Sequence, residues 1–240
     1  QAGSPGQAAQ GLTYPPELAT SLAPMVSRPV DLTAEDVASF VSVGAADLAR
    51  PFDFDDDLSH FRWALATARS YTRIGLDLWK KARPDLGMVY VEATDSTSHL
   101  FGHLFRAEHL SGELREQQQR YGHAVEQMYV YADEILGQFI AAMDDRTVLI
   151  VLSDHGFQLG TLPEDPSKTR DMRRVSERYH TMHGILYLYG HGVRRHSRIE
   201  DPTILDVAPT ALALAGLPPA RDMPGRVLSD PHRATGPRAA

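Results

Sequence analysis

Short apolar runs separated by a long stretch with helical spacing constrain the fold more than any other feature of this sequence. Leu86–Val91 and Thr147–Leu152 are each too short for a buried helix and read as strands. Between them, residues 111–143 have the apolar spacing of a helix. A third apolar run at 184–189 and a helical stretch at 203–215 follow. This order predicts an α/β fold with a mostly parallel sheet flanked by helices.

The rest of the chain divides by composition into a lead-in, a helical part and a tail. Helices are predicted from Thr33, which opens a capping signature, to about Val43, and again over residues 58–81. Asp206 is expected to cap or brace the last helix. The predicted regions are an irregular lead-in at 1–30, a helical cap or insert at 31–85, a metal-binding α/β region at 86–230 and a disordered tail at 231–240.

Composition narrows the function classes and the ligand types. The net charge of −7 and the lack of a basic stripe argue against a nucleic-acid-binding surface. The longest bulky aliphatic run, Val148–Leu152, is far below the ~20 residues of a transmembrane helix. With no cysteine, a transition-metal site must use the 11 histidines and 31 acidic residues. The excess of arginine over lysine suggests a GC-rich bacterial genome, and a periplasmic or a cytoplasmic location fits equally well.

Asp–His pairs follow two of the predicted strands. Asp95 and His99 come after the first strand, and Asp154 and His155 come directly after the second. The carboxyl ends of strands in an open α/β sheet meet at one edge, so both pairs are expected there. Asp56 and His60 have the same four-residue offset, but they enter a helix, where a solvated face is the simpler interpretation. Position after a strand, rather than spacing, therefore marks the candidate metal ligands.

The order of these motifs resembles a known family. Leu149–Phe157 (Leu-Ile-Val-Leu-Ser-Asp-His-Gly-Phe) is similar to the strand and Asp-His-Gly element of the alkaline phosphatase superfamily. Asp95–His99 and His180–Leu186 resemble the Asp-x-x-x-His and His-x-x-x-Gly elements of its type I phosphodiesterase/nucleotide pyrophosphatase branch. Residues 204–218 and 222–228 resemble the C-terminal helix and tail of that branch. The likeness runs from about Tyr14 to Leu228.

The resemblance implies a site for two zinc ions, or for other divalent metals in their place. Asp95, His99 and one of His180 and His183 would hold the first ion. His180 is favoured because the family histidine stands four residues before the glycine, here Gly184. His183 is the alternative, with an outer-sphere or core role otherwise. Asp154 and His155 would hold part of the second ion.

Two departures from the family pattern affect these expectations. The nucleophilic Thr or Ser, and the Asp that completes the second metal site, normally lie after an early strand that ends in Asp-Gly. No apolar strand before Pro84 delivers such residues, and Thr13 and Thr33 have loop and cap contexts. The chain therefore resembles the C-terminal portion of a longer enzyme, with the missing N-terminal part of the same polypeptide as its partner. His191 replaces a usual proline and is expected on a surface loop.

The function that the resemblance implies is zinc-dependent hydrolysis of phosphoric esters, with a small phosphate ester as substrate. A sulfatase or a metal-dependent phosphomutase of the same superfamily is an alternative. A catalytically silent metal-binding domain is another, because no nucleophile is visible. A serine acyl hydrolase is disfavoured, because the sequence has no Gly-x-Ser-x-Gly elbow.

Overall fold

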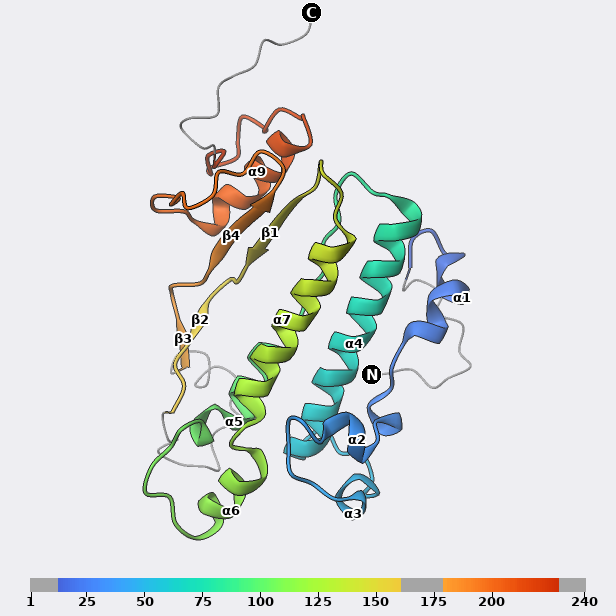
Figure 1. The fold of residues 1–240 in the computed structure, drawn as a ribbon, viewed down its shortest axis with the longest axis vertical. Coiled ribbons are helices and arrows are strands. Elements are labelled where there is room, and N and C mark those ends of the chain that lie inside the picture. Colours follow the sequence, from blue (N-terminus) through green and yellow to red (C-terminus); the bar gives the residue numbers. More distant parts are fainter. Residues whose placement is uncertain (1–12, 161–178, 229–240) are drawn as a thin grey trace, which may run out of the picture.

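The structure, a computed structural model, describes residues 13–160 and 179–228 (Figure 1). Two long helices dominate it, and short strands lie to one side of them. The helices are α1 (Leu18–Leu22), α2 (Ala34–Val37), α3 (Ala45–Leu48), α4 (Asp57–Ala82), α5 (Ala93–Phe101), α6 (Gly112–Tyr121), α7 (Ala124–Ala142) and α9 (Val207–Leu214). The strands are β1 (Val148–Leu152), β2 (Gly156–Phe157), β3 (His180–Thr181) and β4 (Leu186–Gly190), and 3-10 turns lie at Ala23–Met25 (η1), Pro29–Asp31 (η2), Gly102–Leu104 (η3) and Ile204–Asp206 (η5).

Local sequence signals account for the ends of α2 and α4. The side chain of Asp56 accepts a hydrogen bond from the Ser59 amide at the start of α4. That helix ends at Ala82, and its C-cap residue Arg83 has a left-handed φ of 49° and directly precedes Pro84. Thr33 caps α2 in a reciprocal capping box, as its sequence predicts, although the helix ends at Val37. The predicted helix over 58–81 is confirmed.

The single helix predicted over residues 111–143 is two helices. The helix is interrupted at Gly122 and His123, between the polar α6 and the apolar α7. No residue of α6 is buried, whereas α7 buries one stripe that includes Val125 and Met128. Because glycine is a poor helix former, the change from a solvated to a packed helix occurs there.

The hydrophobic core lies where α4, α5 and α7 meet. The two long helices pack side by side, and α5 contacts both of them. Phe61 of α4 is fully buried, and its ring centroid lies 6.0 Å from that of Phe101 in α5. Val125 and Met128 of α7 complete this cluster. The core thus combines residues from both sides of the predicted boundary at 85–86, and the domain boundaries themselves remain predictions.

Both described strand pairs are antiparallel, and the predicted parallel sheet is not observed among the described residues. β1 pairs with β4 from Val148 opposite Gly190 to Leu152 opposite Leu186. β2 pairs with β3, with Phe157 opposite His180. The amide of Ser153 donates to the carbonyl of Ile185 (N···O 3.1 Å) between the two pairs. Residues 148–157 and residues 180–190 therefore lie alongside each other in opposite directions, which makes both pairings antiparallel. The coarser expectation of mixed helices and strands holds.

The strand predicted at Leu86–Val91 is wrong for the described structure. These residues form an irregular segment between α4 and α5. Most of its large apolar side chains are open to solvent, with Leu86 60%, Met88 87% and Tyr90 66% exposed. A strand requires a ladder of hydrogen bonds to a neighbour, and no described strand lies in register with this segment. High strand propensity alone therefore did not produce a strand.

The helix predicted over residues 203–215 is present as α9, and its first residues form the 3-10 turn η5. Asp206 is 4% exposed and accepts hydrogen bonds from the amides of Thr203 and Arg226, at 2.8 Å each. Those two hydrogen bonds, that from Arg226 first, lower the pKa of the Asp206 carboxyl. The predicted bracing role of Asp206 is confirmed. No helix within residues 13–160 or 179–228 combines the length and apolar character that crossing a bilayer requires.

Candidate metal centre

Asp95 and His99 lie on helix α5, in a part of the chain for which the sequence predicts no helix. Ala93, Thr97 and Phe101 recur every four residues on α5 and are each at most 2% exposed in the core. Their burial holds the segment in helical form, because amphipathic packing supplies most of the stability of a short helix. Asp95 and His99 are also four residues apart, so they lie one turn apart on another face of α5.

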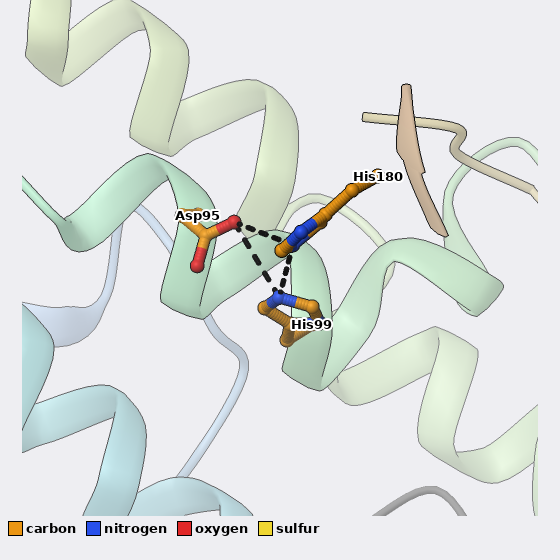
Figure 2. Close-up of side chains that lie close together, drawn as sticks. All are labelled: Asp95, His99 and His180. Atoms are coloured by element: carbon orange, nitrogen blue, oxygen red, sulfur yellow. Dashed lines mark hydrogen bonds and ion pairs between the residues drawn. The ribbon is translucent and has the colours of Figure 1, made fainter. Parts of the chain in front are cut away.

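His180 of β3 approaches this face of α5 (Figure 2). Asp95 Oδ1 lies 3.4 Å from His99 Nε2 and 3.5 Å from His180 Nε2. The two Nε2 atoms are 2.9 Å apart. The three ligand atoms all lie within 4.8 Å of one another. The structure thus brings together the three residues that the sequence assigns to the first metal, with His180 rather than His183.

The second predicted pair lies beside this cluster. His155 Nε2 is 3.8 Å from Asp95 Oδ1, and the His155 imidazole stacks on that of His180 with ring centroids 3.7 Å apart. Asp154 Oδ1 is 3.7 Å from His155 Nε2, and its side chain is 75% exposed. All five predicted ligands therefore lie close to one another, although their role as ligands remains a prediction.

The two remaining histidines of this region lie elsewhere. The His183 side chain is exposed and forms no hydrogen bond, ion pair or ring contact within the described part of the chain. A Cβ on Gly156 would lie only 2.3 Å from the backbone carbonyl oxygen of His183. This close approach is the physical reason for glycine in the Asp-His-Gly motif. His191 is exposed on the loop after β4, as predicted, and its Nδ1 lies 2.8 Å from the Asp145 carbonyl oxygen.

The side chains that converge here fit a divalent cation. Asp95 Oδ1 is buried and accepts no hydrogen bond from the residues that the structure describes, an arrangement that costs free energy unless a positive charge is close. Burial lowers the pKa of His99, and the neighbouring imidazoles of His180 and His155 lower it further, against the opposing effect of Asp95. The neutral form of His99, which a metal needs, is thereby favoured. A carboxylate with imidazoles and no thiolate is a ligand set that zinc accepts.

Sequence reasoning missed two side chains that interact electrostatically with residues of this cluster. His60, predicted on a solvated face, is half-buried against Phe54 and Trp63, and its charge contributes to the lowered pKa of His99. The pKa of Tyr90 is raised by burial and by the negative charges of Glu92, Asp154 and Asp95. Tyr90 is close in sequence to Glu92 and Asp95, but only the fold brings it near Asp154.

This protein has a mixed α and β fold with a candidate metal centre, in which a carboxylate and imidazoles converge from a helix and a strand. The type I phosphodiesterase / nucleotide pyrophosphatase family model matches residues 11–206. The chain therefore belongs to this family, which is part of the alkaline phosphatase superfamily, and the resemblance drawn from its motifs is confirmed. Searches of curated proteins and of solved structures each gave no significant match. The family supports phosphoric ester hydrolysis in general.

Proposed function

We propose that this chain is the metal-binding part of a zinc-dependent hydrolase of phosphoric esters. The observation that carries the proposal is the convergence of Asp95, His99 and His180 in a member of this family. The three side chains would hold one zinc ion, and Asp154 and His155 would supply part of a second site. The substrate would be a small phosphate ester.

The bound metals would supply positive charge that lowers the pKa of an attacking hydroxyl and offsets the charge on phosphoryl oxygens. The chain's own residues prepare the site for this chemistry. Asp95 presents a carboxylate oxygen from the first turn of α5, and burial favours the neutral form of the His99 imidazole. Asp154 is mostly exposed, so its carboxylate would be accessible to a metal ion and a substrate from solvent.

Three hydroxyl groups of α5, close in sequence to Asp95 and His99, are already committed to the fold. Ser96 Oγ donates to the Glu92 carboxylate and Ser98 Oγ donates to the Thr94 carbonyl, and both residues are buried. Thr97 is fully buried on the core face of α5. We therefore propose that the nucleophilic hydroxyl, and the carboxylate that completes the second metal site, come from an upstream segment of the same polypeptide.

Substitution of the two neighbouring histidines tests the proposed ligand set. His180→Ala removes an Nε2 atom 3.5 Å from Asp95 Oδ1, whereas His183→Ala alters an exposed side chain. We expect His180→Ala to lose most of its zinc, and His183→Ala to keep nearly all of it. Zinc per chain is measured by mass spectrometry after dialysis against a weak chelator. The reverse order would transfer the ligand role to His183, and equal retention would contradict the site.

A further inference from the structure

The His99 imidazole lacks the hydrogen bond that usually orients a metal-ligating histidine. Such a histidine normally donates its second ring N–H to a carboxylate, a carbonyl or water, and this bond fixes the ring orientation. His99 Nε2 faces Asp95 and His180, which leaves Nδ1 for that role. His99 Nδ1 is buried and has no hydrogen-bond partner within the described structure. Another contact must therefore hold the ring.

Phe157 makes that contact with both histidines of the cluster. It lies in β2, directly opposite His180 of β3. Its ring centroid is 4.8 Å from that of His99, with the rings at 78°, and 5.7 Å from that of His180, at 64°. Near-perpendicular rings at these separations have the favourable edge-to-face geometry of aromatic pairs. One side chain thus braces two of the three candidate ligands of the first metal.

The position of the Phe157 ring is itself fixed from two sides. Tyr179 stacks on it with the planes at 6° and the centroids 5.8 Å apart. On the α5 side, a Cβ at Gly102 would lie 3.6 Å from Phe157 Cε1 and 3.0 Å from the side chain of Leu159. The amide of Gly160 donates to the Gly102 carbonyl (2.8 Å), which fastens this strand end to the end of α5. The ring therefore has little freedom to shift.

We propose that Phe157 is a positioning residue that sets the imidazole orientations of His99 and His180, so that both Nε2 atoms face Asp95 Oδ1. This inference rests on the proposed metal site. Without the ring, the His99 imidazole would turn about its side-chain bonds, because no hydrogen bond at Nδ1 restrains it. Each rotation of an imidazole away from the cluster removes a ligand atom and lowers the affinity for the metal.

The test is the substitution Phe157→Leu in the full 240-residue chain, with Phe157→Tyr as the conservative variant. Loss of an orienting contact next to a metal ligand typically costs about 10–100-fold in metal affinity, and we expect a loss in that range for Phe157→Leu. Phe157→Tyr keeps the ring and should bind zinc nearly as tightly as wild type. The zinc Kd is measured by competition with a chromophoric chelator. Cobalt(II) bound in place of zinc reports ligand geometry through its visible absorption, which should change only for Phe157→Leu.

Phe101→Leu is the matched control for loss of packing. Phe101 is buried in α5, the helix that carries Asp95 and His99, but its ring contacts Phe61 and stacks on Tyr121 instead of the imidazoles. Its variant should lower the melting temperature of the metal-free chain at least as much as Phe157→Leu, with little change in the zinc Kd. Wild-type affinity in Phe157→Leu, or an equal loss in Phe101→Leu, would overturn the positioning role. Absence of zinc binding by the wild-type chain would instead refute the proposed metal site.

Discussion

Asp95→Ala should abolish tight zinc binding by this chain. Asp95 supplies the carboxylate oxygen that lies within 3.8 Å of three imidazole nitrogens, those of His99, His180 and His155. Removal of this ligand also removes the negative charge that offsets the metal. We expect the zinc affinity to fall by more than the ~100-fold that marks the upper end for outer-sphere changes. Isothermal titration with zinc measures the loss.

Two other aspartates serve as controls for Asp95→Ala. Asp77→Ala removes an aspartate of α4 that pairs with Lys81, in a different helix from the metal ligands, and should leave zinc binding unchanged. Asp154→Ala should affect only a weak second equivalent of zinc, because the first three ligands remain. Retention of one tightly bound zinc per chain in Asp95→Ala would contradict the ligand assignment.

The second large effect concerns catalysis. The 240-residue chain should hydrolyse a nitrophenyl phosphate ester only slightly, because the proposed nucleophile lies outside it. A longer polypeptide that carries the proposed upstream segment should be active and should bind the second zinc ion. Loss of a nucleophile in a well-studied hydrolase costs about 10⁶ in kcat, and we expect a difference approaching that size. Initial rates at saturating zinc, with and without chelator, measure it.

Each outcome of this comparison discriminates between functions. Robust, chelator-sensitive turnover by the 240-residue chain would show that its nucleophile lies within it. A longer polypeptide that binds two zinc ions yet cleaves neither phosphate nor sulfate esters would favour a catalytically silent metal-binding domain. Preferential cleavage of sulfate esters would identify a sulfatase instead.

The sequence predicted those elements whose stability is mostly local. Apolar periodicity located α4, α7, β1 and β4, and the capping signature at Thr33 marks the start of α2. α5 was missed because its polar run from Thr94 to His99 resembles a loop. What makes it a helix is the burial of Ala93, Thr97 and Phe101 against α4 and α7, a tertiary effect.

Strand pairing could not be predicted for the same reason. Residues 86–91 have the composition of a buried strand, yet no described strand pairs with them. A strand forms only when it pairs with another strand, and a single sequence does not show which segment that is. The antiparallel direction of β4 against β1 likewise follows from how the segments 148–157 and 180–190 pair in the folded chain.

For the candidate site, motif order predicted more than spacing did. The family motifs located Asp95, His99 and His180, which the structure brings within 4.8 Å of one another. The same Asp–His offset at Asp56 and His60 marks a helix cap and a half-buried ring instead. The contacts of Phe157 with two imidazoles join residues 58 and 23 positions apart in sequence (157 − 99 and 180 − 157), so a single sequence could not reveal them.

The most direct test of the central claim is a crystal structure of the zinc-loaded chain with anomalous scattering recorded on both sides of the zinc absorption edge. The account predicts a zinc-specific peak in contact with Asp95 Oδ1, His99 Nε2 and His180 Nε2, at about 2.0–2.2 Å from each. A zinc peak elsewhere, or none at this position in saturating zinc, would contradict it.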